Sequence, residues 1–67
     1  MARLIVGGKE IRKFRVVRLL QAHPLGLTEV EIASLLGWER RTANNYLRVL
    51  QSCHLVYKEG RLWYTEQ

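Results

Sequence analysis

The sequence predicts an α+β domain in which three helices precede a two-stranded hairpin, and three observations predict it. Residues 28–50 have the pattern of two helices joined by a tight turn. Residues 9–22 hold no glycine or proline and many apolar side chains, which is typical of a preceding helix. Residues 55–64 hold two apolar and aromatic runs around a glycine, which indicates a hairpin. This order is that of a three-helix winged helix-turn-helix with a two-stranded C-terminal wing, and residues 1–67 form a single domain.

The N-terminal segment, residues 1–8, is open to two interpretations. The apolar run Leu4 to Val6 stands before a Gly7-Gly8 pair. This composition predicts either a short N-terminal strand or a loose arm. The first helix then covers residues 9–22 and ends before the His23-Pro24 pair, because the residue before a proline disfavours the helical conformation.

The apolar residues of this first helix do not form one stripe on a helical wheel. One broad arc holds Phe14, Val16, Val17 and Leu20. Ile11 and Leu19 fall toward the other side. Either the N-terminal segment folds over Ile11 and Leu19, or a second copy of the chain covers them, and we expect a homodimer.

The second helix is predicted over residues 29–36, because local signals mark both of its ends. Thr28 can cap its start, and Glu31 stands three residues later, as in a capping box. Gly37 follows the last apolar residue, where a left-handed backbone favours glycine. Only Trp38 and Glu39 then remain before the third helix, so the two helices cross steeply.

The third helix, predicted over residues 40–53, has one apolar and one polar face. The apolar face holds Ala43, Tyr46, Leu47 and Leu50. The polar face holds Arg41, Asn45, Arg48 and Ser52, with Asn44 on its flank and Arg40 in the first turn. A polar surface helix is common on proteins that bind no nucleic acid. Its coincidence with the helix-turn-helix pattern favours a recognition helix that enters the DNA major groove.

The residue types on this helix suit the reading of DNA bases. Arginine can donate two hydrogen bonds to guanine, and asparagine can pair in the same way with adenine. We therefore predict four base-reading residues, namely Arg40, Arg41, Asn44 and Asn45. Thr42 and Arg48 are expected to contact the DNA backbone.

The wing is predicted over residues 55–64, with a Glu59-Gly60 turn between Lys58 and Arg61. Pairing around that turn sets Tyr57 against Leu62 and Val56 against Trp63. Both faces carry large apolar groups, so the sequence leaves open which face is buried. Lys58 and Arg61 at the tip are candidates for contacts with DNA phosphates, although a solvated surface turn explains them equally well.

Length and composition argue against catalysis. A chain of 67 residues has a core too small to enclose a substrate pocket. It contains no Asp, and His23, His54 and Cys53 do not have the spacing of a catalytic triad or a metal cluster. Cys53 is the single cysteine, which excludes an intrachain disulfide. We expect no enzymatic activity, no cofactor and no metal.

The formal net charge of +5 favours a polyanionic partner, either nucleic acid or an anionic membrane. No apolar run approaches the roughly 20 residues that span a bilayer. The N-terminus also lacks the apolar core of a secretory signal. We therefore expect a cytoplasmic protein with double-stranded DNA as its partner and no membrane contact.

From about Val16 to Thr65 the sequence resembles the N-terminal DNA-binding domains of bacterial winged-helix transcriptional regulators, especially those of the DeoR type. The phrases that carry the resemblance are LLQAHPLGLTEVEIASLLGWERRTANNYLRVLQ and LVYKEGRLWY. The resemblance implies a repressor or activator that binds operator DNA as a dimer. It also implies an effector-sensing domain after the wing, which we expect outside this chain.

Two residues depart from the pattern of that family. Glu39 replaces the Ser or Thr usual before the recognition helix, which weakens the cap and places a negative charge near the DNA. His54 replaces the glycine usual before the wing, and a left-handed conformation there costs more for His than for Gly.

Winged helices also serve as docking modules for proteins, which gives a second hypothesis. In that case Ile11, Leu19 and Trp63 form the docking surface, and the basic charge keeps the domain soluble. Binding of single-stranded nucleic acid is a third and weaker hypothesis, because the sequence offers few aromatic residues for base stacking.

Overall fold

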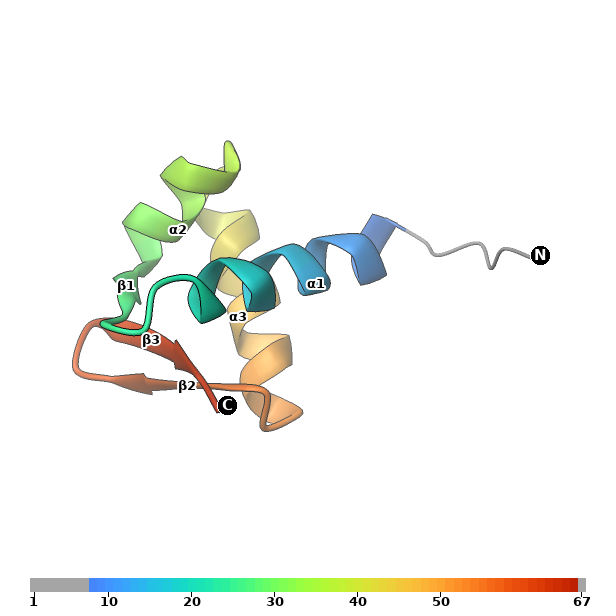
Figure 1. The fold of residues 1–67 in the computed structure, drawn as a ribbon. Helices are drawn as coiled ribbons and strands as arrows, with labels where there is room; N and C mark the ends of the chain where they lie inside the picture. Colours follow the sequence, from blue (N-terminus) through green and yellow to red (C-terminus); the bar gives the residue numbers. More distant parts are fainter. Residues whose placement is uncertain (1–7, 67) are drawn as a thin grey trace.

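The computed structural model describes residues 8–66, and its element order is that of a winged helix-turn-helix (Figure 1). The elements in chain order are α1 (Gly8–Gln21), β1 (Leu27–Thr28), α2 (Glu29–Leu36), α3 (Arg40–Ser52), β2 (Val56–Glu59) and β3 (Leu62–Thr65). The predicted α+β fold of three helices and a C-terminal wing is confirmed. The strand or arm predicted before the first helix lies outside the described residues, except for Gly8, which begins α1.

The sheet has one strand more than the sequence predicted. The strand order is β1-β3-β2, and β1 pairs antiparallel with β3 through Leu27 opposite Trp63 and Thr28 opposite Leu62. A strand of two residues is too short to show alternation in the sequence, so only its pairing with β3 reveals it. This pairing ties the segment that enters α2 to the wing.

The register of the wing differs from the predicted one by two residues. Tyr57 lies opposite Tyr64, and Glu59 lies opposite Leu62, so the two turn residues are Gly60 and Arg61. Gly60 has φ +63°. A two-residue turn of type II′ requires glycine at its first central position, whereas the predicted turn placed Glu59 there, where a side chain is disfavoured.

The core lies where the three helices meet the inner face of the sheet. Its buried residues are Val16, Leu20, Leu27, Ile32, Ala33, Ala43, Leu47, Leu50, Val56 and Trp63. The prediction that Trp63 belongs to a docking surface is therefore wrong, because this side chain is only 3% exposed. Its strand, β3, is the central one of three, and α1 packs against it.

Helix α1 buries a narrower face than the wheel predicted. Val16 and Leu20, one turn apart, are fully buried, whereas Phe14 is 59% exposed and lies 5.5 Å from the Arg18 guanidinium. Leu19, predicted on the docking surface, is half-buried and packs against the core. Ile11 is exposed, as a docking residue needs to be.

The ends of α2 have the geometry that the sequence predicted. The Glu31 N–H donates to Thr28 Oγ1 at 3.2 Å, and the Thr28 N–H donates to Glu31 Oε1 at 2.9 Å, which completes the capping box. Gly37 adopts φ +72°, and the Trp38 N–H donates to the Ala33 carbonyl at 2.9 Å. These bonds satisfy the last carbonyls of α2 and turn the chain toward α3.

Helix α3 lacks a side-chain cap at its start, and a non-glycine residue is left-handed after its end. Glu39 occupies the N-cap and makes no side-chain bond to the helix. After its last turn His54 adopts φ +62°, and the Leu55 N–H donates to the Leu50 carbonyl at 3.0 Å. The left-handed residue before the wing is thus a histidine, as the departure from the family pattern indicated.

Candidate nucleic-acid interface

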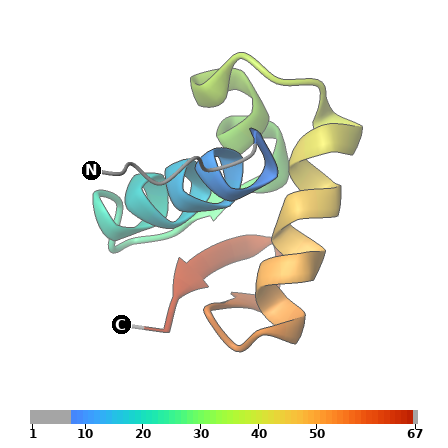
Figure 2. The same ribbon diagram turned by 90° about the vertical axis from the view of Figure 1, so that its right-hand side faces the viewer.

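Helix α3 stands along one edge of the molecule, with α1, α2 and the wing on one side of it (Figure 2). Its inner face is buried through Ala43, Leu47 and Leu50. A helix packed on one side presents the opposite side to solvent, because side chains repeat every 3.6 residues. The 13 residues of α3 therefore form a rod with one covered and one accessible face.

The accessible face gathers three of the residues that the sequence singled out. Arg41, Asn45 and Arg48 are all exposed and fall within one arc of the helix. Two guanidinium groups and one amide offer many hydrogen-bond donors and only one acceptor group. Such a face suits an electronegative partner with acceptors on its surface.

Arg40 and Asn44 lie on the flank of α3 that faces α2. Arg40 Nε donates to Glu29 Oε2 at 3.3 Å, and Asn44 Nδ2 donates to Glu29 Oε1 at 3.2 Å. The Glu29 side chain is only 20% exposed, whereas that of Arg40 is 70% exposed. Two of the four predicted base-reading residues are thus bound to another element of the same chain.

Sequence reasoning did not assign a role to Glu29. It lies 11 residues from Arg40 and 15 from Asn44, so no helical spacing connects them. In the sequence, only its position in the first turn of α2 pointed to such a contact. The short connection between the helices brings the start of α3 close to that turn.

The turn between α2 and α3 is held by an aromatic pair. The rings of Trp38 and Tyr46 lie 5.4 Å apart and are tilted by 46° to each other. Both residues pack against the core. Sequence reasoning treated Trp38 only as a connecting residue, but this contact fixes the direction in which α3 leaves the turn.

The remaining predicted contact residues differ in exposure. Thr42 is half-buried, while Lys58 and Arg61 of the wing are exposed. Lys58 Nζ lies 5.5 Å from the centre of the Trp63 ring, its neighbour across the strands. This cation–π contact holds the charge of Lys58 on the same face of the wing as the core residue Trp63.

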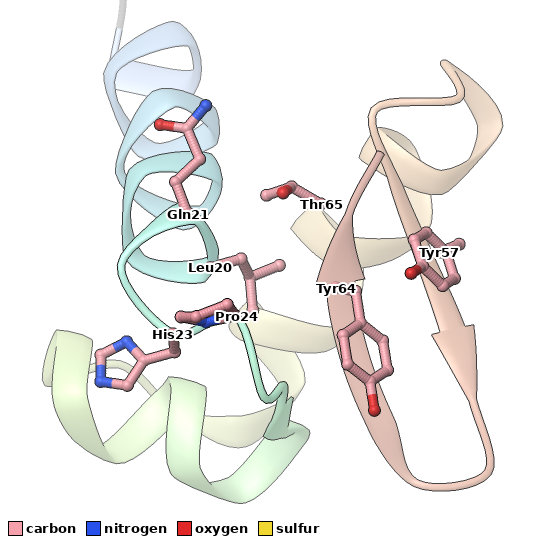
Figure 3. Close-up of a pocket in the computed structure, with 7 residues that line it drawn as sticks. All are labelled: Leu20, Gln21, His23, Pro24, Tyr57, Tyr64 and Thr65. Carbon is pink, nitrogen blue, oxygen red and sulfur yellow. The ribbon is translucent and has the colours of Figure 1, made fainter. Parts of the chain in front are cut away.

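A small cavity of about 190 Å³ lies away from α3, between the end of α1 and the wing (Figure 3). Its lining residues are Leu20, Gln21, His23, Pro24, Tyr57, Tyr64 and Thr65. Ligand pockets usually measure about 300 to 1,000 Å³, so this cavity is small for a cofactor. The polar face of α3 remains the better candidate site.

Residues 8–66 also bear on metal binding and membrane insertion. In this range no three His, Cys, Asp or Glu side chains gather in a way that could hold a metal ion. None of the helices in the same range has the length and apolarity needed to cross a membrane.

Comparison with known proteins gives one family match and one structural match. The model of the IclR helix-turn-helix domain matches residues 11–60. A solved structure of an O-methyltransferase family protein from Burkholderia thailandensis is similar, with 26% sequence identity and a TM-score of 0.67. The similar region covers 85% of this chain but only 18% of that one, so this chain spans a small part of that protein. Curated protein sequences gave no match.

These findings correct one expectation. The matching model is of the IclR type, so the resemblance to the DeoR type in particular is not supported. The wider expectation of a winged helix-turn-helix regulator domain is confirmed. A capped helix, a glycine turn and a basic second helix follow from the physics of the motif, so they do not separate one family of this fold from another.

Proposed function

Because this chain belongs to the IclR helix-turn-helix domain family, we propose that it binds double-stranded DNA in a sequence-specific manner and regulates transcription, with α3 in the major groove. The observation that carries the proposal is the polar face of α3. Arg41, Asn45 and Arg48 are exposed on the side of the helix opposite its buried residues. The width of a major groove admits one helix presented in this way.

The proposed contacts divide into base reading and backbone binding. Arg41 and Asn45, at the centre of the accessible face, read bases directly. Arg40 and Asn44 read bases from the flank of the helix that faces α2. Four residues contact phosphates, namely Thr42 and Arg48 on α3 and Lys58 and Arg61 on the wing.

The proposal extends to a cytoplasmic homodimer with an effector-sensing domain outside this chain. The dimer contact involves Ile11, which is 49% exposed, and the neighbouring Phe14, which is 59% exposed on the same helix. Leu19 contributes less than its position on the wheel suggested, because it packs against the core of its own chain. A dimer places two recognition helices on half-sites separated by about one turn of DNA.

The experiment that tests this function is selection of duplexes from a random pool with the purified chain, followed by binding to the recovered sequence. We expect an inverted repeat bound more tightly than a scrambled duplex of equal length. Recovery of single half-sites supports DNA reading by a monomer and contradicts the dimer. If no sequence is enriched, the proposal that α3 reads bases is wrong.

The second candidate is a protein-interaction module within a larger assembly. Its support is the similar fold inside an O-methyltransferase family protein, in which it makes up 18% of the chain. The exposed apolar residues Ile11, Phe14 and Leu55 provide a docking surface in place of Trp63. Absence of duplex binding even at low salt favours this function over DNA binding.

A further inference from the structure

Glu29 of α2 makes polar contacts with two residues of α3. It lies in the first turn of α2, where the positive end of the helix dipole stabilises a carboxylate. Its two oxygens accept from different side chains of α3, Oε2 from Arg40 Nε at 3.3 Å and Oε1 from Asn44 Nδ2 at 3.2 Å. One carboxylate therefore engages two residues that stand four apart on one flank of α3.

These bonds leave the groups that bind DNA available. Arginine has five N–H donors, and the Nε bond uses one of them. The terminal nitrogens still carry four donors, and the Arg40 side chain is 70% exposed. Asn44 keeps its carbonyl oxygen and one amide hydrogen outside this bond. Glu29 therefore holds both side chains without using the remaining hydrogen-bonding groups of either one.

Orientation matters because a long side chain loses conformational entropy when it binds. Immobilising one such side chain at an interface weakens binding by roughly two- to twelvefold. A side chain that is already held in place avoids much of this cost when its partner fits, and it cannot swing toward an alternative base or phosphate. Pre-orientation therefore raises the preference for one sequence.

We propose that Glu29 is a positioning residue that sets base preference by fixing Arg40 and Asn44 on the flank of α3. This inference rests on the proposed DNA-binding function. It assigns a specificity role to a residue of α2 that contacts α3 and does not itself read bases. It also gives a reason for a carboxylate beside a basic surface, where its charge alone opposes DNA binding.

Charge and position have different consequences for binding. Loss of one negative charge strengthens binding to every duplex, because phosphate attraction does not depend on sequence. Loss of orientation lowers the ratio of the dissociation constant for a random duplex to that for the selected duplex. The second effect alone identifies a positioning residue.

The test compares Glu29→Ala with Glu39→Ala in the full chain, using the selected and the random duplex in a fluorescence anisotropy titration. Glu39 is the matched control, because it is exposed beside the start of α3 and makes no side-chain cap bond. Both variants lose one negative charge beside the recognition helix. Glu29→Gln is a third variant, which loses the charge but keeps one acceptor oxygen.

For Glu29→Ala we expect the specificity ratio to fall about fivefold while binding to the random duplex becomes tighter. For Glu39→Ala we expect tighter binding to the random duplex and a smaller change in the ratio. The specificity ratio of Glu29→Gln is expected to lie between those of Glu29→Ala and the wild-type chain. Base preferences recovered by repeated selection are expected to relax at the positions that Arg40 and Asn44 face.

An unchanged ratio in Glu29→Ala overturns the proposal. An equal fall in the ratio for Glu39→Ala also overturns it, because the effect then does not depend on the bonds from Glu29 to Arg40 and Asn44. A purely structural role of Glu29 also overturns it: fewer folded molecules weaken binding to both duplexes by the same factor. A wild-type chain that binds no duplex overturns this inference together with the proposed function, whereas wild-type binding with an unchanged ratio overturns this inference alone.

Discussion

At the scale of single residues, the polar face of α3 contains side chains with different surroundings and therefore different expected effects. Arg41 and Asn45 are exposed on the arc opposite the buried residues. Arg40 and Asn44 are oriented by Glu29. Under the proposed function, the first pair takes its final conformation on the DNA, whereas the second pair is already held by hydrogen bonds within the chain.

Replacement of Arg41 by alanine tests direct base reading. We expect Arg41→Ala to weaken binding to the selected duplex and to relax the preference at one base pair by roughly 1 to 3 kcal/mol. Lys58→Ala serves as the control, because a phosphate contact on the wing carries no sequence information. It is expected to weaken binding to selected and random duplexes alike in the same titration. Equal losses on both duplexes for Arg41→Ala contradict a reading role.

His54 has a left-handed backbone conformation, which is unfavourable for a residue with a Cβ atom. Its φ of +62° is the one left-handed value among non-glycine residues 8–66. This conformation costs roughly 1 to 2 kcal/mol for a residue with a Cβ atom.

We expect His54→Gly to raise the free energy of unfolding by about 0.5 to 1 kcal/mol, after the greater chain entropy of unfolded glycine is subtracted. Urea denaturation followed by circular dichroism measures the change. Gly37→Ala is the opposite control, because Gly37 has φ +72° and open space around it, and it is expected to destabilise the chain by about 1 kcal/mol. Destabilisation by His54→Gly contradicts this account and indicates that the imidazole contributes more than its backbone costs.

At the scale of elements, the two helices of the motif differ in how their first turns are satisfied. Helix α2 has a complete capping box through Thr28 and Glu31. Helix α3 begins at Glu39, which supplies no side-chain bond. The start of α3 is therefore the weaker of the two boundaries.

We expect Glu39→Ser to stabilise the chain by about 0.5 to 1 kcal/mol, because serine can accept from the exposed N–H groups of the first turn of α3. Thr28→Ala is expected to destabilise it by about 1 kcal/mol through loss of the α2 cap. Thermal unfolding of the two variants beside the wild-type chain measures both effects. An unchanged melting temperature for Glu39→Ser shows that water already satisfies those groups.

The contact between β1 and the wing depends on a glycine. Gly26 has φ +90°, and a Cβ atom there would stand 2.8 Å from the Tyr64 ring and 3.1 Å from the Leu62 Cβ. We expect Gly26→Ala to destabilise the chain by about 1 to 3 kcal/mol, because both the backbone conformation and the space are unsuitable. Urea denaturation measures the loss, and a change below 0.5 kcal/mol, roughly the size of a neutral surface substitution, contradicts this packing.

At the scale of the whole molecule, the net charge of +5 is expected to attract the phosphates of any duplex, whatever its sequence. About five phosphate contacts predict a slope near −4 to −5 when the logarithm of the binding constant is plotted against that of the salt concentration. A titration of the wild-type chain between 50 and 200 mM salt, roughly the range in which such slopes are measured, provides the value. Removal of Lys58 is expected to reduce its magnitude by about one. A slope near zero contradicts an electrostatic contribution from this surface.

Local patterns in the sequence determined the three helices, the capping box at Thr28, the left-handed Gly37 and the apolar face of α3 around Leu47. Each of these depends on residues within about one turn of one another, so periodicity and capping rules reach them. The wing followed from a glycine between two apolar runs, although its register was wrong. Arg41 and Asn45 also lie about one turn apart, so helical periodicity placed them on one exposed face of α3.

Tertiary structure alone decided the features that join distant segments: β1 pairs with β3, Trp63 enters the core, and Glu29 binds Arg40 and Asn44. None of these contacts has a period in the sequence, because their partners come from different elements whose distance depends on how the helices cross and pack. The sequence determined the residue types on the polar face of α3 and its flank, whereas the packing of α2 against α3 fixed how Arg40 and Asn44 are arranged.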